Sequence, residues 1–252
     1  LPFVWLVLSA LKPVDQFYAA PPTLLPAPPT LDNILRALSL VETPRLIAQS
    51  LFVAGASAVG AVFSSAVVGY GFATMRARGR DALFAVVIAT LLVPPAATIV
   101  PQFILFSRLG WVDTYLPLIV PHLFGSAFYI FLFRQWFRSL PAHVFENAEI
   151  DGATPLQAFR HIALPLSVPA MAAVAVFAFV GSWNDFLAPL VYLRSPDSFT
   201  LSVGMATLQG VYVSQLHLSV AISVVALIPP IAVFLVAQRF LSGGVANVGW
   251  RA

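Results

Sequence analysis

Long apolar runs dominate the sequence, and most of them are long enough to cross a membrane as a helix. A helix needs roughly 20 residues to span about 30 Å of hydrocarbon. In addition to five runs of full length, the run Leu1–Leu11 is apolar but only about half that length. It predicts that the sequence starts partway through a first transmembrane helix. A cleaved signal peptide is the alternative, but the run has no basic region before it and no small-residue cleavage site before Lys12. The five full-length runs lie at about residues 46–74, 82–106, 115–137, 167–192 and 218–241.

The composition supports a membrane protein. Hydrophobic residues make up 60% of the 252 residues and charged residues only 9%, whereas a soluble domain carries about a quarter charged residues. With so few charged residues, the chain lacks the polar surface needed to cover a globule in water. Most of its exterior must therefore face lipid. The sequence therefore predicts an all-α, polytopic membrane bundle of six transmembrane helices, the first truncated, that forms one domain over residues 1–252.

The distribution of basic residues predicts the orientation of the bundle. Successive loops lie on opposite sides of the membrane, and one side receives eight arginines against five basic residues on the other. Loops rich in Arg and Lys are usually cytoplasmic, so we expect both termini to be cytoplasmic and the proline-rich loop at about 13–45 to be external and extended in polyproline conformation. The cytoplasmic set is Arg76, Arg78, Arg80, Arg134, Arg138, Arg160, Arg239 and Arg251, and the external set is Lys12, Arg36, Arg45, Arg108 and Arg194.

Two local patterns within the apolar runs predict how the helices pack and bend. Small residues four positions apart let two helix backbones approach closely, and paired prolines kink or locally unwind a helix. The close approach fits either a close-packed core around a pathway or ordinary packing of a bundle. The small-residue pairs are Ala56 with Gly60 and Ser65 with Gly69, and the proline pairs are Pro94 with Pro95 and Pro229 with Pro230.

One stretch, at about residues 139–165, breaks the apolar pattern, and we call it the polar segment. The arginine distribution places it on the cytoplasmic side, between the fourth and fifth transmembrane helices. Its first predicted helix has Pro141 in the first turn and runs to Asp151, where Gly152 stops it. Another residue at this glycine would either adopt the left-handed conformation, at a cost of about 1 kcal/mol, or spoil the turn.

A second short helix is predicted to follow in the polar segment. Thr154 and Gln157 have the spacing of a capping box, and Pro155 suits the first helical position. Pro165 marks where the next membrane helix takes over. The residues expected to share an apolar face are Phe145 and Ala148 on the first short helix, and Leu156, Phe159 and Ala163 on the second.

The polar segment has two physical interpretations. It is either an amphipathic connector that lies on the lipid headgroups or a docking surface for a partner protein. Glu146, Glu149 and Asp151 place three acids within six residues, and an anionic cytoplasmic leaflet would repel them. The charges therefore favour a protein partner.

The residues from Glu146 to Leu166, ENAEIDGATPLQAFRHIALPL, resemble the cytoplasmic signature of binding-protein-dependent ABC importer permeases. That signature reads Glu-Ala-Ala, three residues, Gly, nine residues, Ile, one residue and Leu-Pro. The spacing here matches throughout, and only Asn147 replaces the usual Ala. Two further stretches, SWNDFLAPL at 182–190 and QRFLSGG at 238–244, look like the maltose-type, six-helix carbohydrate branch of that family, and the similarity covers nearly the whole chain.

The resemblance implies a complete transport system in the cytoplasmic membrane of a bacterium or archaeon. It implies a second homologous permease, two ATPase subunits that bind ATP and Mg, and an extracytoplasmic binding protein that delivers the solute. The polar segment would be the coupling helix that docks on an ATPase, and Asn147 places one packing contact of the motif in doubt. The coupling residues carried over are Glu146, Asn147, Ala148, Asp151, Gly152, Ala153, Ile162, Leu164 and Pro165.

The sequence offers no catalytic machinery of its own. It has no phosphate-binding loop of the form G-x-x-x-x-G-K-[ST], so ATP hydrolysis would be supplied in trans. With no cysteine, and with no ligand spacing among its four histidines, it is expected to hold no metal or other cofactor. A net charge of +3 is too small and dispersed for nucleic-acid binding. The absence of acids near mid-membrane disfavours a proton-driven carrier, and the absence of clustered acids or histidines disfavours a membrane-embedded enzyme or scaffold.

Candidate contacts with the solute follow from residue chemistry. Trp183, Asn184 and Asp185 combine an aromatic face, an amide and a carboxylate, as sugar-binding sites do. Asp185 lies roughly 28 Å along its helix, near the outer interface, so the alternative is an interfacial anchor or a contact with a partner subunit. The resemblance implies a sugar, and a polyol or glycerol phosphate is the alternative. Weaker candidates, each also readable as an interhelical hydrogen-bond partner, are Ser64, Ser65, Gln102 and His122.

Overall fold

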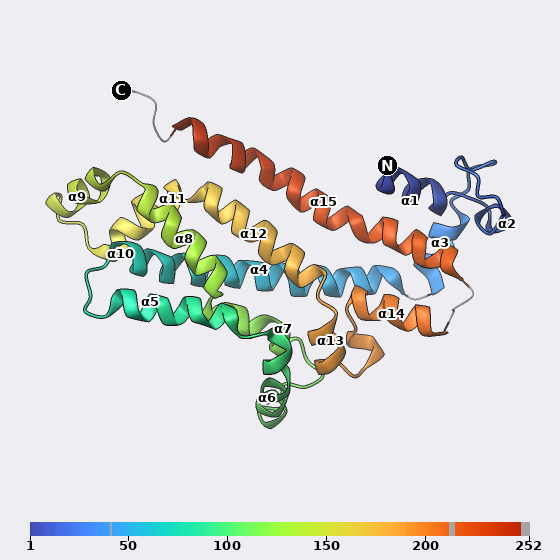
Figure 1. Cartoon of the computed structure of the whole chain (residues 1–252), viewed down its shortest axis with the longest axis horizontal. Coiled ribbons are helices and arrows are strands. Elements are labelled where there is room, and N and C mark those ends of the chain that lie inside the picture. Colours follow the sequence, from blue (N-terminus) through green and yellow to red (C-terminus); the bar gives the residue numbers. More distant parts are fainter. Residues whose placement is uncertain (41, 212–214, 248–252) are drawn as a thin grey trace. The chain divides into compact units, whose positions relative to one another are not determined.

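The computed structural model describes residues 1–40, 42–211 and 215–247, and every regular element in that part of the chain is helical (Figure 1). The all-α prediction is therefore confirmed. Arg251, which contributed to the arginine distribution, lies outside the described residues. The elements are α1 (Pro2–Ala10), α2 (Val14–Phe17), α3 (Asp32–Leu40), α4 (Thr43–Thr74), α5 (Arg80–Ala89), η1 (Thr90–Leu92), α6 (Pro95–Arg108), α7 (Leu116–Ile119), η2 (Val120–Phe124), α8 (Ala127–Ser139), α9 (Ala142–Ile150), α10 (Pro155–Ala158), η3 (Phe159–Ala163), α11 (Leu164–Leu166), α12 (Val168–Trp183), α13 (Leu187–Tyr192), η4 (Pro196–Ser198), α14 (Leu201–Val211) and α15 (Leu216–Asn247).

Several helical segments are long and apolar enough to cross a membrane. Within the described residues there are three, or up to five if each of two bent pairs counts as one span. Four of them match the apolar runs at 46–74, 82–106, 115–137 and 218–241, the second bent pair overlaps the run at 167–192 only beyond Leu166, and α1 coincides with the short run at the start of the sequence. The three segments are Thr43–Thr74, Leu116–Ser139 and Leu216–Leu241, and the bent pairs are Arg80–Leu92 with Pro95–Arg108 and Pro155–Leu166 with Val168–Trp183.

The two proline pairs behave differently. The helices on either side of Pro94 are bent by 98°, and both Val93 and Pro94 have extended backbones, as expected for residues that precede a proline. The predicted break is confirmed there. α15, in contrast, stays helical through Pro229 and Pro230, so α15 does not unwind at that pair, and a kink there stays a prediction. A membrane helix tolerates proline where its surroundings satisfy the freed backbone groups.

The run at 167–192 is not one helix as predicted. α12 ends at Trp183, a turn follows, and α13 begins at Leu187. The carboxylate of Asp185 accepts a hydrogen bond from the Ala188 amide at 3.3 Å. Short polar side chains that bond nearby amides compete with the helical backbone, which accounts for the interruption within an apolar run.

The chain divides into two compact units. α4 and α15 each have one part in the first unit and one part in the second. The second unit contains residues 53–182 and the part of α15 from Val233. Its core joins α4, α8, η3 and α12, with Ala66, Phe133, Ala163 and Val174 fully buried. This core positions the polar segment.

Close backbone contact confirms one of the small-residue predictions. A Cβ added to Gly69 on α4 would lie 2.6 Å from Phe133 Cβ on α8 and 3.1 Å from the Arg134 backbone nitrogen. α4 and α8 therefore touch at this glycine. The approach supports ordinary bundle packing at this position.

The first unit contains residues 1–52 and 183–232, and its proline-rich loop folds back on α1 instead of extending. The Thr30 amide donates to the Leu11 carbonyl at 2.8 Å. The buried amide of Asn33 donates to the carbonyls of Ala10 (3.2 Å) and Lys12 (2.7 Å). The expectation of an extended loop is therefore wrong: α2 and α3 lie within it, and these bonds hold it to carbonyls that the end of α1 leaves unpaired. Its polyproline conformation and its external location stay predictions.

The start of α4 also holds the segment before α14 within this unit. Arg45 donates to the Asp197 carboxylate at 2.9 Å and to the Asp197 carbonyl at 2.7 Å. The buried hydroxyl of Ser50 accepts the Leu201 amide at 2.7 Å, at the start of α14. These bonds join segments about 150 residues apart in sequence.

Candidate coupling site

The first helix of the polar segment, α9, ends as the sequence predicts. Gly152 has a left-handed backbone with φ +81°. The Ala153 amide donates to the Ala148 carbonyl at 2.9 Å and the Gly152 amide to the Glu149 carbonyl at 3.0 Å, which is the Schellman pattern of helix ends. A Cβ added to Gly152 would have nothing within 4 Å. The need for glycine here is therefore conformational and not steric.

The second helix begins with the predicted capping box. The Gln157 amide donates to the Thr154 hydroxyl at 3.3 Å, and the Thr154 amide donates to the Gln157 side-chain oxygen at 2.8 Å. Pro155 occupies the first helical turn, where its missing N–H costs nothing. The start of α10 is thus fixed by local hydrogen bonds.

The transition to the next membrane helix lies beyond Pro165, where the sequence placed it. α10, the π-helical turn η3 and α11 follow one another as far as Leu166, and the axis then bends by 75° before α12. Ser167 explains the position of the bend, because its hydroxyl and its amide both donate to the Leu164 carbonyl, at 2.8 and 3.1 Å. These bonds close the last turn of α11.

Aromatic side chains hold the polar segment to the membrane helices. Phe145 and Phe159 pack against the core of the second unit. The buried ring of Tyr70 on α4 lies 5.0 Å from that of Phe159 and 5.5 Å from that of Phe137 on α8. The Tyr70 hydroxyl also donates to the Pro155 carbonyl at 3.3 Å. Sequence patterns alone did not single out Tyr70, because a tyrosine near the end of an apolar helix reads as an ordinary interfacial residue.

The predicted apolar faces are right except at Leu156. Ala148 and Ala163 are buried as expected, but Leu156 is 73% exposed. The prediction assumed α-helical spacing, whereas residues 159–163 form a π-helical turn, which shifts the register of the residues on either side. Ile150, the last residue of α9, is also exposed, at 82%.

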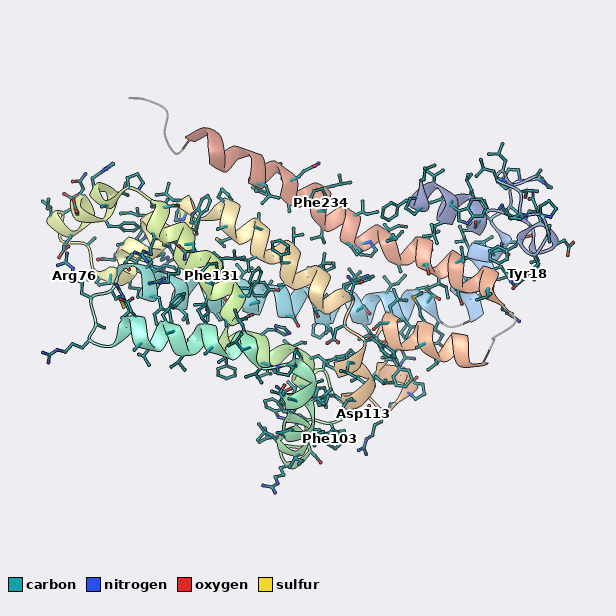
Figure 2. All side chains as sticks on the ribbon, in the orientation of Figure 1. Tyr18, Arg76, Phe103, Asp113, Phe131 and Phe234 are labelled. Carbon is teal, nitrogen blue, oxygen red and sulfur yellow. The ribbon has the colours of Figure 1, made fainter. Side chains whose placement is uncertain are left out.

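The acidic residues of the polar segment face solvent, as a docking surface requires. Glu146, Glu149 and Asp151 are all exposed. The loop between α4 and α5 that carries Arg76 lies at the same end of the second unit as α9 and α10 (Figures 1 and 2), which agrees with the placement of both on one side of the membrane. Of the other predicted coupling residues, Asn147 and Pro165 are exposed, Ala148 is buried, and Ala153, Ile162 and Leu164 are partly buried.

Comparison with known proteins identifies the family. The model of the family described as "Binding-protein-dependent transport system inner membrane component" matches residues 61–247. The chain belongs to this family. The lactose transport system permease LacG of Rhizobium radiobacter is 30% identical to this chain. The match covers 98% of this chain and 90% of LacG. The arabinooligosaccharides transport system permease AraQ of Halalkalibacterium halodurans is 34% identical, again over 98% and 90%.

A solved structure shares the fold of the permease. A chain of a bacterial ABC transporter involved in the import of the acidic polysaccharide alginate superposes with a TM-score of 0.81, at 23% sequence identity. The match covers 94% of this chain and 89% of the other. The two chains therefore share a fold.

The predicted solute contacts of the permease are Trp183, the last residue of α12, and Asn184 and Asp185 in the turn between α12 and α13. Trp183 is buried and Asn184 is exposed. The Asp185 carboxylate accepts a hydrogen bond from the Ala188 amide in the first turn of α13, and the Asp185 carbonyl accepts one from the Ser202 hydroxyl at 2.6 Å. Asp185 therefore has a structural role in shaping this turn. Contact between these three residues and the solute stays a prediction.

The weaker polar candidates include two interhelical hydrogen-bond partners. The Ser64 hydroxyl donates to the His122 carbonyl at 3.0 Å, and the Ser65 hydroxyl accepts the Ser126 amide at 3.3 Å. Both serines join α4 to the chain around α8, as their alternative interpretation predicts. Gln102 lies exposed on α6. Within the described part of the chain, no group of three or more acidic or histidine side chains could hold a metal ion.

The structure shows what Arg134, a charged residue inside an apolar run, contacts. The side chain of Arg134 on α8 is almost buried, and its guanidinium lies 3.9 Å from the centre of the Phe84 ring on α5. It also donates to the Asp81 carboxylate and to the Phe72 carbonyl, at 3.3 and 3.4 Å. Arg134 thus ties α8 to both helices of the α4–α5 hairpin.

Proposed function

We propose that this permease is one of two membrane subunits of an ATP-driven sugar importer, and that its polar segment receives the movement of separate ATPase subunits. A solute-binding protein and a second permease complete the proposed system. Relatives named for lactose and arabinooligosaccharides support a sugar. The absence of a phosphate-binding loop in the sequence supports ATP hydrolysis in trans.

The architecture of the polar segment carries this proposal. A turn that faces solvent joins two short helices, and both helix ends at this turn are closed by local hydrogen bonds around Gly152 and Thr154. Behind them, aromatic rings join the segment to α4 and α8. A push on the turn would therefore move close-packed helices instead of deforming the turn. Such rigid-body movement is what alternating access requires.

The same proposal sets the orientation of the chain. The polar segment and the arginine-bearing α4–α5 loop would face the cytoplasm, where the ATPases act, with both termini on that side. The proline-rich loop and the α13–α14 region would then face the binding protein. A protease or labelling reagent applied to sealed right-side-out vesicles distinguishes the two faces.

Reconstitution of the whole transporter tests the coupling role. Gly152→Pro, which cannot adopt a positive φ, and Glu146→Lys, which reverses an exposed charge, are expected to lower sugar uptake and uptake-linked ATP hydrolysis while the permease still accumulates in the membrane. Full uptake in vesicles that carry either variant would contradict the proposal. Uptake of a panel of labelled sugars, with glycerol phosphate and a polyol as competitors, tests the solute class.

Gly110 offers a matched control for the glycine variant. It ends α6 with φ +70°, its amide donates to Ser107 at 3.1 Å, and the Trp111 amide donates to Phe106 at 2.9 Å, so its local structure repeats that of Gly152. Gly110→Pro therefore disrupts the same kind of helix end, but outside the polar segment. We expect it to leave ATPase subunits bound to the permease, whereas Gly152→Pro releases them.

A further inference from the structure

The end of the second unit that carries the α4–α5 loop holds an excess of positive charge. Two guanidinium groups share the carboxylate of Asp81 at the start of α5, since Arg80 and Arg134 each lie 3.3 Å from it. Three further arginines at this end form no salt bridge with any residue that the structure describes. We call them the arginine patch: Arg76 and Arg78, exposed on the α4–α5 loop, and Arg138, exposed at the end of α8, where its charge acts on Asp81 and Arg134.

The acids of the polar segment do not neutralise the arginine patch. Glu146, Glu149 and Asp151 are exposed, and α9, which carries Glu146 and Glu149, lies at the same end of the second unit as Arg76 (Figures 1 and 2). Within the described ranges, however, the salt bridges of this unit join Asp81 only to Arg80 and Arg134. The arginine patch therefore keeps its positive charge and attracts an anion from outside the chain.

An apolar face of α5 lies next to the arginine patch. Leu83 is 61% exposed and Val86 is 64% exposed, and a spacing of three residues places them on one side of the helix. Arg80 donates to the Met75 carbonyl at 3.0 Å, so it lies against the α4–α5 loop. At 1.5 Å per residue, Leu83 and Val86 are about 4.5 and 9 Å further along α5. The surface thus presents guanidinium groups at one level and apolar side chains at the next.

This combination of charge and apolar surface selects the class of ligand. The planar guanidinium group of arginine matches phosphate oxygens with paired N–H donors. A free phosphate ion would satisfy the arginines and leave α5 uncovered. An acidic soluble protein could not cover Val86, because α5 belongs to a segment apolar enough to cross a membrane. A phospholipid with a net negative charge satisfies both levels, and such lipids are abundant in the cytoplasmic leaflet.

We propose that the arginine patch binds the phosphate headgroup of an anionic phospholipid whose acyl chain lies along Leu83 and Val86 of α5. The phosphate bridges the α4–α5 loop to the end of α8, the same elements that Arg134 ties together from inside. Because α8 leads into α9, the bound lipid steadies the helices that support the polar segment. The inference goes beyond the proposed function, since it depends neither on the solute nor on the ATPase.

Quenching by brominated lipids tests the position of the acyl chain. The sequence has no cysteine, so Leu83→Cys carries a single fluorescent label beside the proposed lipid. The labelled permease is reconstituted in phosphatidylcholine vesicles that contain equal mole fractions of brominated phosphatidylglycerol or brominated phosphatidylcholine. We expect phosphatidylglycerol to bind beside the label at least about fivefold more tightly, because one basic residue near a membrane surface contributes about this factor. Equal quenching by the two lipids would overturn the inference.

A second labelled position shows whether the preference is local. Val59 is 59% exposed on α4, roughly midway between Arg45 and Arg76 in the sequence. A label at Val59→Cys faces no comparable group of arginines, so the two brominated lipids should quench it equally. The same preference for phosphatidylglycerol at both labels would show a general enrichment of that lipid around the chain and would contradict a site at the arginine patch.

Substitution of the arginines tests the headgroup contact. Arg76→Gln with Arg78→Gln should abolish most of the preference for phosphatidylglycerol at the Leu83→Cys label, and both side chains are exposed, so the chain should still fold. The matched control is Arg36→Gln with Arg108→Gln, which removes the same number of exposed arginines elsewhere and should leave the preference unchanged. An equal loss in both pairs would mean that only the total charge matters, against the proposal.

Two other occupants of the arginine patch predict different results. Inorganic phosphate has no acyl chain, so it should not displace brominated phosphatidylglycerol. Displacement by phosphate, but not by chloride at the same ionic strength, would assign the patch to a free anion. If Arg76→Gln with Arg78→Gln releases the ATPase while the lipid preference persists, the patch binds a protein and the lipid site is wrong.

Discussion

The contact between α4 and α8 at Gly69 gives a quantitative test of the packing beneath the polar segment. In Gly69→Ala, the new Cβ would lie 2.6 Å from Phe133 Cβ and 3.1 Å from both the Arg134 nitrogen and the Ile130 carbonyl oxygen. Ordinary contact begins at 3.4 Å, so the helices must separate by roughly 0.8 Å. Two of the three atoms belong to the backbone, so no side-chain rotation relieves the clash. Overpacking of this kind costs about 1–3 kcal/mol.

Gly55→Ala supplies the control, because Gly55 lies on the same helix and a Cβ there would have nothing within 4 Å. Both variants gain the same helix propensity, about 1 kcal/mol, so their difference isolates the contact with α8. For a chain of this size, 1 kcal/mol corresponds to about 2–4 °C in melting temperature.

The assay is thermal unfolding of the purified permease in detergent, together with uptake in vesicles. Gly69→Ala is expected to melt at least about 2 °C below Gly55→Ala and to show lower uptake. If the two variants melt together, the close approach of α4 and α8 does not contribute to stability and the reasoning is refuted.

Two further predictions concern single hydrogen-bonded side chains. Tyr70→Phe removes only the hydrogen bond to the Pro155 carbonyl and should lower the free energy of unfolding by about 0.5–1.5 kcal/mol. Tyr70→Ala also removes the ring from the aromatic cluster, so it should lower that free energy by about 3–5 kcal/mol and uncouple ATP hydrolysis from uptake. Equal stimulation of ATPase activity in both variants would contradict this. Ser50→Ala leaves the buried Leu201 amide without its acceptor and should lower stability by about 1–3 kcal/mol, while Ser39→Ala, at an exposed site, should not change the melting temperature.

The sequence determined the features that depend on a few neighbouring residues. The lengths of the apolar runs located the membrane segments, because a helix in lipid must satisfy its backbone within a span of fixed thickness. The end of α9 at Gly152 and the capping box at Thr154 were equally predictable, since their hydrogen bonds link residues no more than five apart. The signature in the polar segment was readable for the same reason.

Only the tertiary structure decided features that depend on distant parts of the chain. Both proline pairs look alike in the sequence, yet the helix is interrupted at Pro94 whereas α15 continues through Pro229. The proline-rich loop folds back because the buried amide of Asn33 bonds carbonyls more than 20 residues away. Leu156 is exposed because a π-helical turn, which no periodicity revealed, changes the register beside it. Long-range packing and a single extra residue in one turn decide which side chains remain at the surface, and local patterns do not encode either.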